Sequence, residues 1–418
     1  MHRSRLVGWV VLAVFVVTAC ARVQPHLTLP DVALGEPSFF PTLEAYASAP
    51  IVGGNRVDLL LNGDETFPAQ LELIRAAQRS ITYAQYFYED GPIARGIAEA
   101  LAERCRAGVS VNVLLDAFGT LGMPSEFIDN MKKSGCQVAQ FRPLYRVWPG
   151  AKTNNRMHRR VLVSDGRVAI TGGSGVSQKW MGNGRIDDHW RDTDTRIEGP
   201  AVTYVQGAFA ESWLEATGVV LGGEAFFPAP VAAPRGQVYV QVVRSSPAGG
   251  SFAIYTAFLL ALSSARKSIY VTNPYFVLDE KMTEALLGAK QNGARVVVLV
   301  PGKIDHNLVR QASRADFGRL LKAGVEIYEY RAALLHAKTM VIDGVWSTVG
   351  STNLDNRSFA LNDELNVIFY SREVAERMEQ VFRDDLAHAR QVTYDGWAKR
   401  GLKEKFLELV AFPIRDLL

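Results

Sequence analysis

Cysteine and histidine are scarce in this chain, and neither is arranged as a structural metal site would require. The 418 residues include three cysteines and seven histidines. No Cys/His cluster has the spacing of zinc ligands, so we expect no metal. Cys105 and Cys136 are the two cysteines of the expected fold. A disulfide between them and two separate buried thiols are both compatible with the sequence.

The chain also lacks a strong excess of charge of one sign. Its formal net charge is +3, and removal of residues 1–19 with Arg3 and Arg5 would leave +1. A protein so close to neutral has no bulk attraction for nucleic acid, so we expect no nucleic-acid partner. A local basic groove remains compatible with this composition.

Helical and strand-like segments alternate along the chain in two similar series. The first series has helices at 68–79, 93–106 and 125–133 and strands at 80–87, 109–115 and 137–141. The second has helices at 254–266, 280–291 and 309–322 and strands at 268–272, 294–300 and 325–330. This alternation predicts an α/β fold with a largely parallel or mixed sheet, made of two fused halves.

Segments rich in proline and glycine suggest the limits of these halves. Residues 21–50 contain five prolines and little periodicity, which predicts a tether. Residues 218–236 predict a linker between a first half at 51–217 and a second half at 237–390. The remaining tail, 391–418, contains an amphipathic helical pattern around residues 402–410. That pattern is compatible with binding at a bilayer surface and with docking on the fold.

A histidine and a cation two residues apart close each series. His336-Ala337-Lys338 leads into an apolar segment that ends at Asp343, and His158-Arg159-Arg160 leads into one that ends at Asp165. We expect these segments to be strands, on which side chains two residues apart share a face. A histidine beside a cation suits a phosphodiester, because the imidazole attacks phosphorus or donates a proton while the cation holds the oxygens.

These two segments resemble the signature of the phospholipase D superfamily, His-x-Lys-x4-Asp followed by Gly-Ser-x-Asn. The second element is Gly350-Ser351-Thr352-Asn353 in one half and Gly172-Gly173-Ser174 in the other. The resemblance implies two phospholipase D-like α/β halves that form a pseudo-dimer with one shared active site. We expect Ser174, Ser351 and Asn353 to bind substrate, and Asp165 and Asp343 to brace strand ends.

Two histidines can divide the chemistry of phosphodiester transfer. Attack on phosphorus needs a neutral imidazole, whereas the departing alkoxide needs a proton from a charged one. The resemblance implies a covalent phosphohistidine that is resolved by water or by an alcohol. It assigns His158 as the nucleophile and His336 as the general acid and then base.

Each histidine also needs a group that holds its second ring nitrogen. The resemblance places acidic residues for this role at Glu364 and at the matching Asp192, with Asp194 and Asp363 as the nearest alternatives. The first motif departs from the superfamily pattern in two ways. Arg160 stands in place of lysine, and no asparagine follows Ser174. Arginine keeps the charge but changes the geometry of phosphate binding.

The N-terminus is typical of a targeting segment. The apolar run Leu6–Val17 follows Arg3 and Arg5. As a helix the run spans roughly 18 Å, which is shorter than the ~30 Å hydrocarbon core of a bilayer. Val17-Thr18-Ala19-Cys20 resembles a bacterial lipobox, which implies cleavage before Cys20 and its acylation. A plain signal peptide and an uncleaved anchor are the alternatives. All three place the catalytic part in the cell envelope, outside the cytoplasm.

Several further segments resemble bacterial cardiolipin synthases and their relatives: Thr272-Asn273-Pro274-Tyr275-Phe276, Arg191-Asp192-Thr193 with Glu198-Gly199-Pro200, and Gly172-Gly173. The resemblance implies a membrane-associated phosphatidyltransferase that acts on phospholipids without a cofactor. Three other functions stay open: a phospholipase D that releases phosphatidic acid, a nuclease of the superfamily, and a non-catalytic phosphate-binding module. The sequence does not identify partner proteins.

Overall fold

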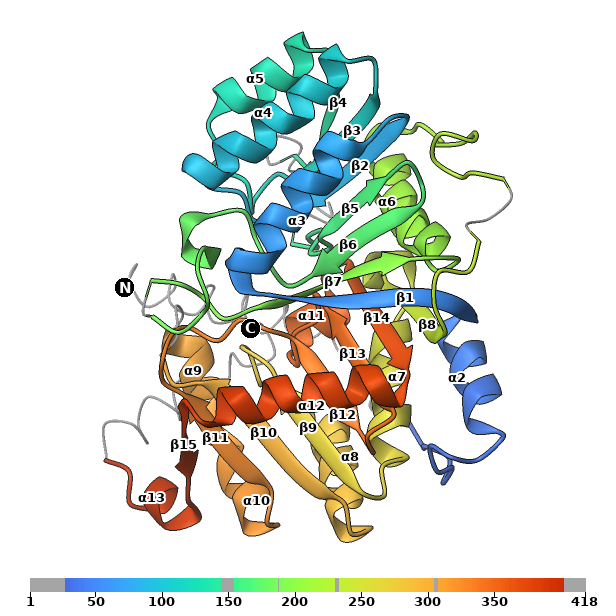
Figure 1. Ribbon diagram of the computed structural model, residues 1–418. Helices are drawn as coiled ribbons and strands as arrows, with labels where there is room; N and C mark the ends of the chain where they lie inside the picture. Colours follow the sequence, from blue (N-terminus) through green and yellow to red (C-terminus); the bar gives the residue numbers. More distant parts are fainter. Residues whose placement is uncertain (1–26, 144–153, 187, 230–232, 304–306, 402–418) are drawn as a thin grey trace, which may run out of the picture.

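One mixed β-sheet runs through both halves of the protein, with helices on its two faces (Figure 1). The computed structural model describes residues 27–143, 154–186, 188–229, 233–303 and 307–401. The first half contributes β1 (Ile51–Leu61), β2 (Ser80–Gln85), β3 (Ser110–Asp116), β4 (Gln137–Phe141), β5 (Val161–Ser164), β6 (Val168–Gly172) and β7 (Thr193–Glu198). The second contributes β8 (Val238–Ser245), β9 (Ser268–Thr272), β10 (Arg295–Pro301), β11 (Glu326–Tyr330), β12 (Thr339–Ile342), β13 (Trp346–Gly350), β14 (Glu364–Tyr370) and β15 (Ala389–Val392).

The two halves have equivalent strand orders. The first reads β4-β3-β2-β5-β6-β7-β1, and the second reads β11-β10-β9-β12-β13-β14-β8 with β15 added at its edge. Strands β2 to β4 are parallel, as are β9 to β11. The antiparallel pair β1 and β8 joins the halves at the centre. The prediction of an α/β fold made of two similar halves is confirmed.

Helices cover the sheet because each buries an apolar stripe on it. One face carries α3 (Asn62–Ala76), α4 (Pro92–Arg106), α5 (Ser125–Lys133), α7 (Ala253–Ser263), α8 (Glu280–Gln291), α9 (Asn307–Ala315) and α10 (Phe317–Lys322). The other face carries α6 (Val202–Thr217) on the first half and α12 (Arg372–Leu386) on the second, and Figure 1 shows α12 crossing the strands of the second half. The helix expected at 309–322 is in fact two helices, which meet at Asp316.

A hydrophobic core spans the junction between the halves. It gathers buried side chains from β5, α6, β8, β14 and α12. Two separate clusters fill the opposite face, one under each half. Since the central cluster draws on both halves, moving one half against the other would expose this core to water.

The proline-rich segment 21–50 is not a free tether along its whole length. Residues Phe39–Ala47 form α2, which packs on α7 and the core of the second half. Phe39, Leu43 and Ala47 recur at helical spacing and are buried. Pro41 lies in the first turn, where the backbone N–H has no intrahelical partner to lose. The prolines therefore led the sequence analysis to miss a short helix. The helical spacing of its apolar residues could have indicated it.

Both ends of the chain fall partly outside the described residues. The predicted signal segment with Cys20 and the amphipathic helix around 402–410 lie there, and both stay predictions. In the first residues of the predicted 391–418 tail, β15 ends at Val392 and α13 (Tyr394–Ala398) follows. Trp397 of α13 packs closely on Gly318 of α10.

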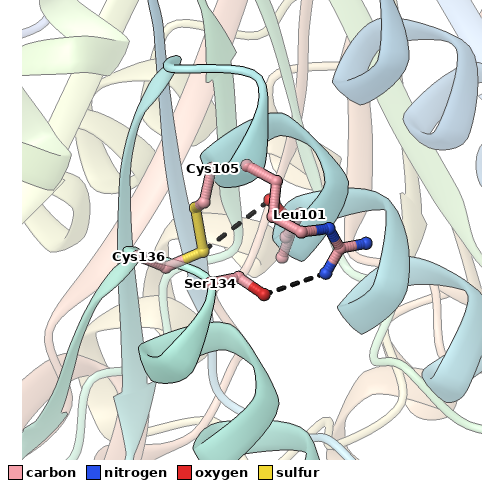
Figure 2. The surroundings of a disulfide bond; sticks show 5 residues. Leu101, Cys105, Ser134 and Cys136 are labelled. Carbon is pink, nitrogen blue, oxygen red and sulfur yellow. Dashed lines mark hydrogen bonds between the residues drawn. A yellow bond between two sulfur atoms is a disulfide. The ribbon is translucent and has the colours of Figure 1, made fainter.

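Cys105 and Cys136 form a disulfide, one of the two possibilities left open by the sequence (Figure 2). It ties the end of α4 to the residue before β4, with the two Cα atoms 5.5 Å apart. Arg106 donates a hydrogen bond to Ser134 beside it. This link lies at the amino end of β4, whereas the site described below is at the carboxyl end of the parallel strands.

Candidate active site

The two motif histidines lie just before strands rather than on them. Strand β5 begins at Val161, after His158 and Arg160, and β12 begins at Thr339, after His336 and Lys338. The expectation that each histidine and its cation are strand residues was therefore wrong. The backbone N–H groups of His336 and Ala337 both donate to the carbonyl of Arg191, in the other half, so they are not part of a β-ladder.

The structure pairs each histidine with the carboxylate of the opposite half. His158 Nδ1 lies 2.9 and 3.0 Å from the two oxygens of Glu364. His336 Nδ1 lies 2.6 Å from Asp192 Oδ2. A carboxylate accepts, so Nδ1 of each ring carries the proton and Nε2 is left for chemistry. Each half therefore supplies a histidine for one pair and the acid for the other.

Backbone hydrogen bonds reinforce this crossing. The N–H of His158 donates to the carbonyl of Asp363 at 2.9 Å, and the N–H of His336 donates to the carbonyl of Arg191 at 2.7 Å. Asp363 and Arg191 are the residues immediately before the two orienting carboxylates. Each histidine is thus held by both its backbone and its ring to one short segment of the other half.

The two cations lie against their own histidines. Lys338 Nζ is 2.9 Å from Nδ1 and 3.1 Å from Nε2 of His336, and it also donates to the backbone carbonyl of that residue. Arg160 donates to the backbone carbonyl of His158, and its guanidinium lies over the ring of Tyr86 at 5.5 Å. Both cations are buried. Positive charge therefore lies close to both histidines.

The three predicted substrate-binding residues have different surroundings. The Ser351 hydroxyl donates to Glu364 and accepts the N–H of Leu365, so it holds the acid rather than facing an open site. The N–H of Asn353 donates to the Ser358 hydroxyl at 3.1 Å. Ser174 is buried, with its N–H directed at Asp194 at 3.3 Å. Roles for Ser174 and Asn353 on substrate stay predictions.

Asp165 and Asp343 hold corresponding turns together. The carboxylate of Asp165 accepts the N–H groups of residues 78–80, and that of Asp343 accepts those of residues 266–268. Both have a positive φ, 53° and 54°. Aspartate tolerates this left-handed conformation better than most residues. Each motif aspartate thus fixes the end of the strand that follows its histidine.

The alternative acids do not contact either histidine ring. Asp194 accepts hydrogen bonds from Thr66 at 3.0 Å and from the backbone of Ser174. Asp363 meets His158 through its backbone carbonyl, while its carboxylate lies 3.9 Å from Arg142. Asp192 and Glu364 are therefore the carboxylates placed to orient the imidazoles.

Aromatic side chains surround the site, among them Trp180 and Trp190, which sequence reasoning did not assign to it. The indole N–H of Trp180 donates to Asp192 Oδ2 at 2.8 Å, and its ring meets His336 edge-on at 5.1 Å. The Trp190 ring packs on the rings of Trp180 and His336. Tyr86 meets the ring of His158 at 4.8 Å. Neither Trp180 nor Trp190 lies in a motif segment, so only the tertiary structure reveals this role.

The pKa values of the two orienting carboxylates are shifted in opposite directions. Burial alone would raise the pKa of Asp192, but His336 and Lys338, with the hydrogen bonds from His336 and Trp180, bring this pKa below its usual range. Burial raises the pKa of Glu364 to about 7, despite the hydrogen bond from Ser351 and the charge of Arg160. Asp192 is thus fully ionised near neutral pH, whereas Glu364 is near its titration point.

The buried site disfavours the charged form of both histidines. Burial and then the charge of Lys338 lower the pKa of His336 to about 4, although Asp192 opposes the shift. Burial, followed by the charges of Arg160 and Lys338, lowers the pKa of His158 well below its usual value. The ionised Asp192 favours the imidazolium form of His336.

In the part of the chain that the structure describes, no group of three or more His, Cys, Asp or Glu side chains is arranged to hold a metal ion. Within the same residues, no helix combines the length and apolar character needed to cross a membrane.

The two-half sheet with paired histidine motifs is the architecture of the phospholipase D superfamily. The crystal structure of phosphatidylserine synthase from Haemophilus influenzae shares this fold, with a TM-score of 0.67 over 91% of this chain and 100% of that one, at 12% identity. The crystal structure of polyphosphate kinase from Porphyromonas gingivalis matches with a TM-score of 0.54, over 95% of this chain and 57% of that one, also at 12% identity.

Within that superfamily, the profile described as "Cardiolipin synthase, PLD-like domain" matches residues 71–213 and 258–386, and the chain belongs to this family. Cardiolipin synthase 1 of Bacillus anthracis is 31% identical over 90% of this chain and 75% of that protein. Cardiolipin synthase of Geobacillus kaustophilus is 32% identical over 88% of this chain and 74% of that protein. The superfamily predicted from the two motifs is confirmed.

Proposed function

We propose that this protein is a phosphatidyltransferase that makes cardiolipin or a related phospholipid through a phosphatidyl-histidine intermediate. The observation that carries the proposal is the crossed pairing of two histidines with two buried carboxylates, in a chain of the cardiolipin synthase family. Phospholipids are the substrates, and the reaction needs no redox or nucleotide cofactor.

In the first step, His158 Nε2 attacks the phosphorus of a donor phospholipid. A P–N bond forms and the P–O bond to the head-group alcohol breaks, while His336, acting in its imidazolium form, gives its Nε2 proton to the departing oxygen. The ionised Asp192 supports His336 in carrying that proton. Lys338 and Arg160 are placed to bind the non-bridging oxygens, since both are buried cations beside the histidines.

In the second step, His336 accepts a proton from the acceptor alcohol, the hydroxyl of phosphatidylglycerol. The alcohol oxygen attacks phosphorus and the P–N bond breaks, which restores His158. Over the two steps one phosphodiester P–O bond is broken and another is formed, so the overall exchange is close to isoenergetic. Water in place of the alcohol would give phosphatidic acid.

The N-terminal pattern supports a location in the bacterial cell envelope. Acylation of Cys20 would anchor the protein to a membrane, with the catalytic halves outside the cytoplasm. Mass spectrometry of the purified protein from a bacterial host, with Cys20→Ala for comparison, tests this arrangement. A lipid-modified mature N-terminus at residue 20 supports it, and an unmodified chain that begins at Met1 contradicts it.

Lipid mass spectrometry on mixed micelles of phosphatidylglycerol and phosphatidylethanolamine tests the reaction itself. We expect cardiolipin with the wild type and none with His336→Ala. His388→Ala is a matched control, because this histidine lies outside the site, next to Tyr330. Phosphatidic acid without cardiolipin would indicate a phospholipase D. Unchanged lipids in all three samples would contradict both lipid activities.

A further inference from the structure

The two histidine–carboxylate pairs are held in chemically different ways, although they occupy equivalent positions in the two halves. Isolated bridges place Val176 beside Tyr88 and Leu354 beside Phe276, which sets the correspondence between the loops after β6 and β13. By this register, Gly173 corresponds to Ser351 and Gly175 to Asn353. Trp180 occupies the place of Ser358.

In the second half the hydrogen-bond donors to the acid are two hydroxyl groups and, at 3.4 Å, the side-chain amide of Asn362. Ser351 donates to Glu364, and Ser358 lies close enough to lower the pKa of the same carboxyl. In the first half the corresponding hydrogen-bond donor is an indole N–H group. Trp180 is 2% exposed, and its N–H donates to the Asp192 oxygen that also accepts from His336.

Two glycines make room for the indole arrangement. A Cβ at residue 173 would lie 2.3 Å from Asp192 Oδ1, so the serine of the second half does not fit there. A Cβ at residue 175 would lie 3.0 Å from both the Trp180 ring and Phe87 Cβ, which leaves little space for an asparagine. Three differences from the second half therefore go together with Trp180. They are the missing asparagine of the first motif, the glycine at 173 and the shorter acid Asp192.

We propose that Trp180 is a positioning residue for proton transfer: its indole N–H fixes the Asp192 carboxylate against Nδ1 of His336. The proposal rests on the proposed function for its kinetic test, but the contact itself does not depend on the substrate. Trp180 also limits the basicity of the acid, because it donates to the same oxygen that His336 uses. Other charged or titratable groups that face the pair are Lys338, Arg160, Arg191, Asp194 and His158.

Trp180→Phe keeps an aromatic ring and removes the N–H, so it isolates the hydrogen bond. The carboxylate would then attract protons more strongly, and the basic limb of the pH profile for kcat would move to higher pH. We also expect kcat at the optimum to fall about tenfold, the range for one charge-assisted hydrogen bond. A purely structural loss would lower activity and Tm without moving that limb.

Trp213→Phe is the matched control. Trp213 is a buried tryptophan of α6 that packs on Phe209, and its N–H has no hydrogen-bond partner among the described residues. We expect this variant to keep the wild-type pH limbs. If Trp180→Phe keeps them as well, the proposal is wrong, whatever happens to its kcat.

A substrate-free measurement covers the case in which Trp180→Phe does not fold. In ¹⁵N-labelled wild-type protein, one indole N–H resonance should change with pH as the Asp192–His336 pair titrates, and His336→Ala should abolish that step. Absence of such a resonance overturns the proposal. A titrating indole in a protein that is inactive on all lipids would support the positioning role and refute the proposed function instead.

Discussion

Replacing Glu364 by glutamine should slow the enzyme in a pH-dependent way, whereas Asp192→Asn should slow it equally at all pH values. Both substitutions keep the shape of the orienting side chain and remove its charge. Glu364 has a pKa near 7 because it is fully buried, while the charges around Asp192 keep it ionised. Glutamine therefore mimics the wild-type residue at low pH and differs from it only above neutrality.

The expected sizes follow from the hydrogen bond to each imidazole. A bond to a charged group contributes about 1.5–3 kcal/mol, or roughly 10- to 100-fold in rate. We expect Glu364→Gln to match the wild type within about threefold near pH 5.5. The deficit should reach the full 10- to 100-fold above about pH 8. For Asp192→Asn the full deficit should be present throughout.

The Glu364→Gln substitution should raise the free energy of unfolding although it lowers activity. The folded-state pKa of this acid lies above its ordinary value of 4.5, so the wild type loses stability as pH rises from there through about 7. The glutamine variant avoids that loss and should be more stable by about 3 kcal/mol at pH 8. Near pH 4 the two proteins should be equally stable.

Two measurements decide the matter: kcat/KM for cardiolipin formation and urea unfolding, each over a range of pH. The ratio of wild-type to variant kcat/KM cancels ionisations that the proteins share. A constant ratio for Glu364→Gln across this range would refute the reasoning. So would a stability difference that is the same at pH 5 and pH 8.

Three other predictions concern structural links and the unusual cation. Asp343→Ala removes an acceptor for three backbone N–H groups at a φ of 54°. Urea unfolding should show that the free energy of unfolding falls by about 2–4 kcal/mol. An unchanged unfolding midpoint would show that Asp343 does not hold the end of its strand in place. Reduction of the Cys105–Cys136 disulfide opens a 31-residue loop. It should cost about 3–4 kcal/mol, seen as a lower Tm with kcat unchanged. Arg160→Lys should lower kcat/KM several-fold and Arg160→Ala about hundredfold, because lysine keeps the charge without the fork that reaches both phosphate and backbone. A lysine variant more active than the wild type would show that the arginine does not serve this reaction.

Local patterns predicted several elements of the two halves well. Helices α5 and α8 and strands β4 and β9 have the bounds expected from periodicity and from the flanking glycines. These segments carry unambiguous apolar spacing. The repeated series also led directly to the two-half architecture.

Other features depend on contacts that no local pattern encodes. Strand β1 was not expected, since Gly53-Gly54-Asn55 interrupts its apolar residues, and the structure accommodates them in a register shift against β8. The acids at 192 and 364 were found by resemblance, but which histidine each one meets depends on the junction of the halves. The role of Trp180 likewise arises from packing.

The continuous sheet has a consequence for how lipids reach the phosphorus-binding centre. With β1 hydrogen-bonded to β8 and each histidine bonded to a backbone carbonyl of the opposite half, the halves cannot hinge apart during turnover without dismantling the catalytic pairs. Donor and acceptor must therefore exchange while the interior stays assembled. Since the acceptor can approach only after the first alcohol has left, the relative access of water and of a second lipid to the intermediate would decide which of them completes the cycle.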